Sequence, residues 1–197
     1  MDKYPEIEVA RKNGEEKFHV NGNPLPHDLL SFWQWSASDL VGNAMRGILA
    51  EYIVTTAIGK VGGNRTEWDA YDIETNEGVK VEVKSCAYIQ SWSQKKLSAI
   101  QFSIRPTLGW DSKTNSYSTE LARQSDVYVF CVLQHKNQET IDPLNMEQWT
   151  FYVLATSKLN QTVGGQKTIT LGRLKELKPI IVSYGELSTS IQQSANK

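Results

Sequence analysis

Apolar and polar residues alternate along several short stretches of the chain, and this pattern predicts β-strands. The segment WDAYDIETNEGVKVEVKS, residues 68–85, predicts two strands around a turn, because its valines alternate with charged residues. The segment LSAIQFSIRP, residues 97–106, alternates in the same way and ends at a proline. Two apolar runs, DVYVFCVL at 126–133 and WTFYVLAT at 149–156, predict further strands. The first run is nearly continuous, which favours a central strand covered on both faces.

A helical spacing of apolar residues predicts a helix from about Leu40 to Ile58. Two apolar rows run along it, so we expect it to be well buried. Ser36 or Ser38 could cap its start, and Gly59 is placed to end it. A second helix is expected around residues 171–177.

The remaining segments are polar or rich in turn signals. Asn-Gly pairs at 13–14 and 21–22 predict tight turns in an N-terminal β-hairpin. Residues 107–125 are typical of a long polar loop with room for one short helix. Because there is no internal repeat and no linker, we expect one α/β domain over residues 1–187, followed by a disordered tail over 188–197.

The composition narrows the classes of function. The chain has 197 residues, a formal net charge of −1 and a pI near 6.3, so any phosphate-binding surface must be a local patch. Cys86 and Cys131 lie far apart, which is no disulfide framework or zinc knuckle and fits a reducing compartment. The N-terminal residues lack an apolar core, and no stretch is long enough to span a bilayer. We therefore expect a cytoplasmic protein that does not associate with membranes.

The turn NEG, residues 76–78, sets the register of the hairpin within 68–85. A three-residue loop with Gly78 in the left-handed conformation places Asp72 opposite Glu82. Opposed side chains on one face have Cβ atoms about 4.5–5.5 Å apart, which is close enough for two carboxylates to share a cation. The valines occupy the other face, so Lys84 lies on the polar face with Glu82. Asp69 has the opposite parity, and we expect it to turn away unless a bulge intervenes.

This polar face has two interpretations. Opposed carboxylates repel, and a hard oxygen-binding cation such as Mg²⁺, or Mn²⁺ in its place, would compensate them. Lys84 could then orient a water molecule or neutralise charge on a phosphate, and the chemistry would be phosphodiester hydrolysis. The alternative is an ordinary solvated strand face, since the pattern E-x-K also occurs at residues 15–17 and 176–178.

An aspartate on one strand, VEVKS on the next and a preceding helix that carries RGILAEYIV together resemble the PD-(D/E)xK nuclease superfamily. The region from about 33 to 177 also resembles a group of bacterial and phage proteins of similar length. The resemblance implies a restriction-endonuclease-like mixed β-sheet flanked by helices, and a Mg²⁺-dependent nuclease acting on DNA, with RNA as a second possible substrate. It implies that Asp72 and Glu82 hold the metal, that Lys84 positions or activates water, and that Glu51 joins the metal site.

Two further expectations concern the surroundings of this site. Gly47, one turn before Glu51, would let the helix approach the sheet closely. A basic and aromatic rim for nucleic acid is expected from Lys95, Lys96, Arg105, Trp110, Lys113 and Arg123.

Cleavage of both strands would favour a homodimer. The competing hypothesis is a nucleic-acid-binding or assembly protein that keeps the nuclease fold but does not cleave.

Overall fold

The computed structural model describes residues 4, 7–65, 70–111 and 116–196. Its contacts divide the chain into two compact units, whereas the sequence suggested one domain over residues 1–187. The first unit comprises residues 1–39 and 62–65, and the second comprises residues 40–61 and 66–197. No helix of the described residues is both long enough and apolar enough to cross a membrane.

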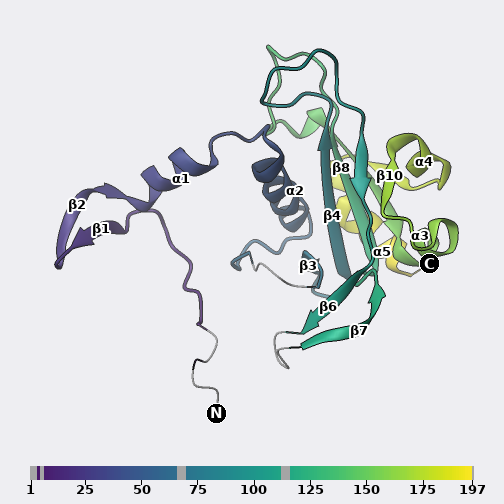
Figure 1. Cartoon of the computed structure of the whole chain (residues 1–197), viewed down its shortest axis with the longest axis horizontal. Coiled ribbons are helices and arrows are strands. Elements are labelled where there is room, and N and C mark those ends of the chain that lie inside the picture. The colour runs from purple at the N-terminus through teal and green to yellow at the C-terminus, as the bar shows by residue number, and fades with distance from the viewer. Residues whose placement is uncertain (1–3, 5–6, 66–69, 112–115, 197) are drawn as a thin grey trace. The chain divides into compact units, whose positions relative to one another are not determined.

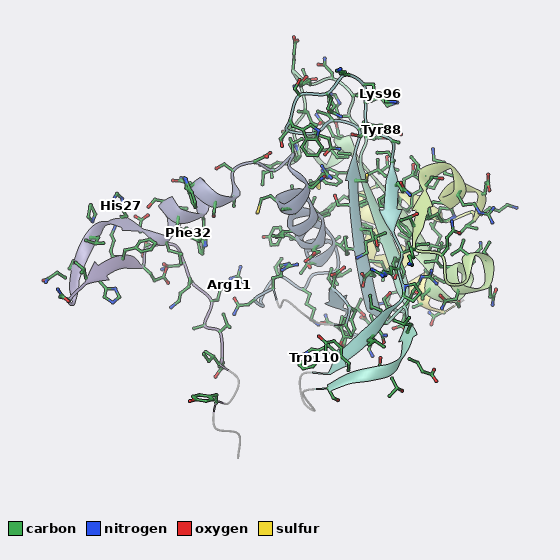
Figure 2. The ribbon with its side chains drawn as sticks, in the orientation of Figure 1. Arg11, His27, Phe32, Tyr88, Lys96 and Trp110 are labelled. Atoms are coloured by element: carbon green, nitrogen blue, oxygen red, sulfur yellow. The ribbon has the colours of Figure 1, made fainter. Side chains whose placement is uncertain are left out.

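The first unit holds the expected N-terminal β-hairpin. Strands β1 (Lys17–Val20) and β2 (Asn23–Asp28) pair antiparallel around Asn21 and Gly22, which both have positive φ. Helix α1 (Leu29–Ala37) follows β2 directly, and none of its nine residues is buried. Most of its apolar side chains, Phe32 among them, are exposed (Figure 2).

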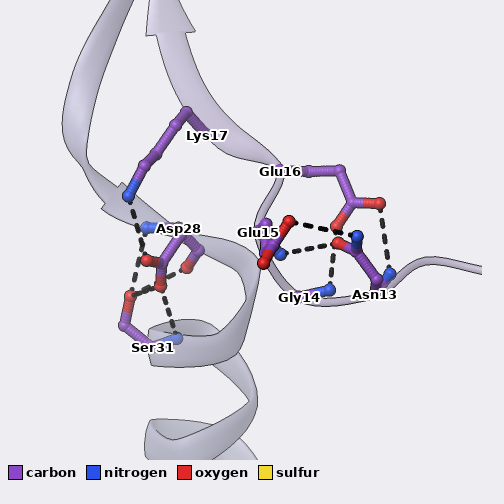
Figure 3. A network of polar contacts seen from close by, with 7 residues as sticks. All are labelled: Asn13, Gly14, Glu15, Glu16, Lys17, Asp28 and Ser31. Carbon is purple, nitrogen blue, oxygen red and sulfur yellow. Dashed lines mark hydrogen bonds and ion pairs between the residues drawn. The ribbon is translucent and has the colours of Figure 1, made fainter.

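A network of polar contacts fixes the start of α1 (Figure 3). The Asp28 carboxylate accepts hydrogen bonds from the Ser31 amide at 2.9 Å and the Ser31 hydroxyl at 2.5 Å, and forms an ion pair with Lys17 at 3.0 Å. These contacts lower the pKa of Asp28, with the Ser31 hydroxyl contributing most. Gly14 has φ of +98°, and a Cβ there would lie 3.2 Å from the Trp33 ring, so the turn before β1 requires glycine.

The second unit is built on a five-stranded mixed sheet (Figure 1). Its strand order is β11 (Ile180–Val182), β9 (Trp149–Ala155), β8 (Val127–Leu133), β4 (Lys80–Ala87) and β3 (Ile73–Glu74). Only the β4–β8 pair of this sheet is parallel. The expected α/β class, with a mixed sheet, flanking helices and an N-terminal hairpin, is confirmed.

Helices cover both faces of the sheet. On one face α2 (Asn43–Ala57) and α5 (Leu187–Ala195) pack against the valines of β4 and alternate residues of β8 and β9. On the other face lie α3 (Thr156–Val163), α4 (Leu171–Glu176) and the two-stranded sheet of β5 (Gln101–Ser103) and β10 (Thr168–Thr170). Every residue of β8 is buried, which confirms that this strand is central.

The helix predicted over 40–58 is present but starts later than expected. Its N-cap is Gly42, whereas Ser36 lies inside α1 and Ser38 is the C-cap of α1. The predicted cap was wrong because α1 ends immediately before this segment. Gly59, with φ of +75°, follows the C-terminal end of α2 as expected.

Two segments predicted to be irregular contain regular secondary structure. Residues 107–125 contain a hairpin of β6 (Thr107–Asp111) and β7 (Ser116–Ala122) rather than a loop. All of β7 is exposed, so it has no buried face to produce a clear hydrophobic pattern. The tail predicted to be disordered forms α5, because Leu187 and Ile191 are fully buried in the core.

Candidate active site

The β3–β4 hairpin has the register that its turn predicts. Ile73 pairs with Val81 and Glu74 with Lys80, and Gly78 has φ of +82°. Beyond Ile73 the strand ends, but the Asp72 amide still donates to the Val81 carbonyl at 3.2 Å. The strand pairing stops at Ile73 and does not include Asp72 and Glu82, but the Glu82 charge raises the pKa of Asp72, so the two carboxylates are neighbours. Asp69, the weaker aspartate candidate, lies outside the described residues.

The Asp72 side chain turns toward β4. Its carboxylate accepts a hydrogen bond from the Val83 amide at 2.7 Å, so it occupies the edge of β4 where β3 has ended. Partial removal from water, then the charges of Glu82 and Glu51, raise the pKa of Asp72 to about 6, against the opposing effects of Lys84 and the Val83 amide. Asp72 as a whole remains exposed.

Glu82 and Lys84 lie next to each other on the face of β4 opposite the valines. Their side chains form an ion pair and are both mostly buried. Burial alone would lower the pKa of Lys84, but the Glu82, Asp72 and Glu51 carboxylates outweigh it and raise that pKa. Lys84 therefore carries a proton at neutral pH and can donate hydrogen bonds, but it cannot act as a general base in this state.

The neighbouring strand contributes a residue that sequence reasoning missed. Tyr128 on β8 pairs with Glu82, is almost fully buried, and lies in the cluster under the same face of the sheet. Burial and the Glu82 charge raise the pKa of Tyr128, so its phenol keeps its proton. Its position in an otherwise apolar run offered no signal in the sequence.

Glu51 lies on α2 and is half-buried. Its charge raises the pKa of both Asp72 and Lys84, so it belongs to the same electrostatic cluster. The expected role of Gly47 is wrong, since a Cβ added there would meet nothing within 4 Å. Glycine is therefore not required at that point for α2 to approach the sheet.

The carboxylates of Asp72 and Glu82 are suitable ligands for a hard cation, but they do not form a complete coordination shell. Among the described residues, no three His, Cys, Asp or Glu side chains are grouped so as to hold a metal. Mg²⁺ keeps several waters and commonly takes only one or two protein carboxylates. Asp72 and Glu82 supply that number, and the raised pKa of Asp72 indicates that a positive charge is favourable beside it.

The residues expected to form a nucleic-acid rim differ in exposure and in position. Lys95, Lys96 and Arg105 are exposed, and Lys113 lies outside the described residues. Trp110 is partly buried and packs on Tyr117, with ring centroids 4.7 Å apart. Figure 2 shows Lys96 and Trp110 beyond opposite ends of β4. A single rim containing both residues is therefore not supported.

Arg123 was wrongly assigned to that rim. It is 8% exposed, and its guanidinium donates to the carbonyls of Ile104, Gly164 and Gln166 at 2.8–3.0 Å. Burial lowers the pKa of Arg123. These contacts tie the segment after β5 to the end of α3, which is a structural role.

Arg46 is a second buried arginine, and no pattern in the sequence indicated its role. It is 2% exposed on α2, and its guanidinium donates to the Ser85 hydroxyl at 3.2 Å and the Gln90 side-chain oxygen at 3.1 Å. Ser85 follows Lys84 directly, so Arg46 joins the helix of Glu51 to the strand of Glu82 and Lys84.

Comparison with known proteins gives one family. A family model described as bacteriophage T4 endonuclease IV matches residues 27–173, about three quarters of the chain. The matched region contains Glu51, Asp72, Glu82 and Lys84. No curated protein matches the chain.

Proposed function

The chain belongs to the bacteriophage T4 endonuclease IV family, a family of nucleases, and we propose that it cuts DNA internally with a divalent cation held by Asp72 and Glu82. The observation that carries this proposal is the convergence of these carboxylates with Lys84 at the edge of β4. Their arrangement also supports the PD-(D/E)xK type of site, which the family match does not itself establish.

In this proposal, the acidic residues of the site bind the cation. Asp72 and Glu82 would hold Mg²⁺, or Mn²⁺ in its place, with Glu51 adding negative charge nearby. A bound cation of this kind polarises a phosphate oxygen and lowers the pKa of a coordinated water. The Val83 amide keeps the Asp72 carboxylate at the strand edge, so one ligand is already oriented before a cation arrives.

Lys84 has a separate role that follows from its charge. The surrounding carboxylates keep it protonated, so it can donate a hydrogen bond to a water or to a phosphate oxygen. As negative charge develops on the phosphate during hydrolysis, a fixed ammonium beside it stabilises that charge. A protonated Lys84 stabilises charge and orients water, and the proton of the attacking water must go to another acceptor.

The test is a cleavage assay with supercoiled, linear, single-stranded and branched DNA and with RNA, each under Mg²⁺, Mn²⁺ or excess EDTA. We expect at least one DNA form to be cut under Mg²⁺ or Mn²⁺ and none in EDTA. Internal cutting should convert supercoiled DNA to open-circular or linear forms. Glu176→Ala, which removes the exposed Arg173–Glu176 ion pair on α4, is a control that should cut like the wild type.

Two outcomes would contradict the proposal. Cutting that persists in EDTA would remove the cation from the mechanism. Binding of DNA without any cutting under either cation would favour a non-cleaving protein that keeps the nuclease fold.

A further inference from the structure

The segment after β4, residues 88–100, forms a loop without helix or strand whose backbone is nevertheless fixed by hydrogen bonds. The Ser98 amide donates to the Tyr88 carbonyl at 2.9 Å and closes the base of the loop. Gln90 is 5% exposed, and its side-chain amide donates to the Ala87 carbonyl at 2.8 Å. Irregular segments held so closely commonly present functional side chains.

Gln94 links the two sides of the loop from within. Its side-chain oxygen accepts from the Gln90 amide at 2.7 Å, and its side-chain nitrogen donates to the Ser98 hydroxyl at 3.0 Å and the Tyr88 carbonyl at 3.2 Å. The loop conformation is therefore set by its own polar residues rather than by a substrate.

Arg46 connects this loop to the candidate active site. Its guanidinium contacts Gln90 in the loop and Ser85 on β4, and it lies on the helix of Glu51. The loop begins at Tyr88, four residues beyond Lys84. At about 3.3 Å per residue, β4 carries the chain roughly 13 Å over that distance.

The side chains that the loop presents to solvent are an aromatic ring and two cations. Trp92 is 53% exposed, and Lys95 and Lys96 are exposed. Figure 2 shows Lys96 and Tyr88 near the end of β4 from which this loop emerges. Residues 83–110 contain four basic side chains and no Asp or Glu, although the whole chain has a net charge of −1.

We propose that the loop 88–98 is a preformed contact for a DNA strand with unpaired bases, in which Trp92 stacks on a base and Lys95 and Lys96 neutralise phosphates. The proposal rests on the proposed function, because it takes DNA as the substrate of the β4 site. A stacking ring needs an exposed base face, which a paired duplex does not offer. Because the loop begins roughly 13 Å along β4 from Lys84, the nucleotides that it contacts would flank the scissile phosphate rather than include it.

The test measures binding to a fluorescent oligothymidine in EDTA over a series of salt concentrations. Trp92→Ala should weaken binding roughly 5- to 150-fold with an unchanged salt dependence, because stacking releases no counterions. Trp92→Phe should retain most of the affinity. The double variant Lys95→Ala/Lys96→Ala should flatten the slope of log K against log salt by about 1.4, since each phosphate contact contributes roughly 0.7.

A matched control is Lys158→Ala/Lys178→Ala, which removes two exposed lysines from the α3–α4 region and should leave the slope unchanged. Gln94→Ala tests the preformed conformation separately. It should speed hydrogen exchange at the Gln90 amide and weaken binding while the salt slope is retained, because both lysines remain.

Trp92→Ala binding within twofold of wild type, or an unchanged slope in the Lys95/Lys96 variant, would overturn the loop assignment even if the protein cuts DNA. If the Trp92 and Lys95/Lys96 variants bind DNA as expected but the wild-type protein cuts nothing under Mg²⁺ or Mn²⁺, the loop assignment is upheld and the proposed function is contradicted. The two inferences can therefore fail independently.

Discussion

Strands β4 and β8 lie side by side in parallel, but one carries charges where the other carries aromatic rings. Glu82 on β4 pairs with Tyr128 on β8, and Lys84 pairs with Phe130. All residues of β8 are buried, whereas β4 alternates between buried valines and partly exposed charged residues.

The difference follows from what lies on the other side of each strand. β8 is flanked by β4 and β9 over its full length, so a charge there would be removed from water. In the part of the chain that the structure describes, β3 pairs with β4 over only two residues, and beyond Ile73 the Asp72 carboxylate accepts a hydrogen bond from the backbone of β4. The sheet therefore provides a place for clustered charges where one of its strands stops.

The largest expected effect on stability is at Phe130, the residue of β8 that pairs with Lys84 of β4. Phe130 is fully buried and its ring lies 5.0 Å from that of Phe102. We expect Phe130→Ala to lower the free energy of unfolding by about 3–5 kcal/mol, because it leaves a cavity in the core. Urea unfolding followed by circular dichroism measures this loss, and a change below about 1 kcal/mol would show that β8 is not packed as described.

A substitution of Lys84, the charged residue of that pair, should reduce cleavage more than stability. We expect Lys84→Ala to reduce cleavage at least about 100-fold, or roughly 2.7 kcal/mol of transition-state stabilisation. Its unfolding free energy should fall by about 1–3 kcal/mol, less than for Phe130→Ala, because the loss of a mostly buried ion pair leaves the Glu82 charge uncompensated. Single-turnover cleavage and urea unfolding of the same preparation measure both quantities. Unchanged cleavage would remove Lys84 from the mechanism.

The clustered carboxylates should make the cation-free protein pH-dependent. The pKa of Asp72 is raised from 3.8 to about 6, so its contribution to stability is full below pH 3.8 and is lost as the pH rises through about 6. Asp72→Asn should therefore raise the melting temperature above pH 6 in EDTA, and have little effect at pH 4. After discounting for the exposure of this residue, we expect about 1 kcal/mol, or about 2–4 °C. A melting temperature of Asp72→Asn below that of the wild type above pH 6 would show that the neighbouring carboxylates do not repel Asp72.

The smallest expected effect tests the helix that faces β4. Gly47 lies inside α2 with open space where a Cβ would be. Gly47→Ala should stabilise the protein by about 0.5–1 kcal/mol, because glycine is a poor helix former, and should leave cleavage unchanged. Thermal unfolding and the cleavage assay check it, and destabilisation would restore a packing role for glycine.

Local patterns predicted the hairpin well and the exposed segments poorly. The register of Ile73 and Val81 follows from a turn of three residues, so nearby sequence determines it. The β6–β7 hairpin was missed because its second strand has no buried face. The helix α5 was missed because its two fully buried residues, Leu187 and Ile191, are separated by polar ones.

Side-chain roles that depend on distant segments could not be predicted. Arg123 resembles any arginine of a polar loop until its acceptors from residues 104–166 are known. Asp72, Glu82 and Lys84 could be grouped from the sequence because a short hairpin brings them together. Tyr128 and Arg46 come to that site through the β4–β8 pairing and the packing of α2, which no local pattern encodes.

Cation binding by the wild-type protein and by Asp72→Asn tests the central claim most directly. Calorimetric titration with Mn²⁺ at pH 7.5 should show saturable binding to the wild type, at least about tenfold weaker binding to Asp72→Asn, and binding to Lys84→Ala close to that of the wild type. Equal Mn²⁺ affinity of the wild type and Asp72→Asn would contradict the account.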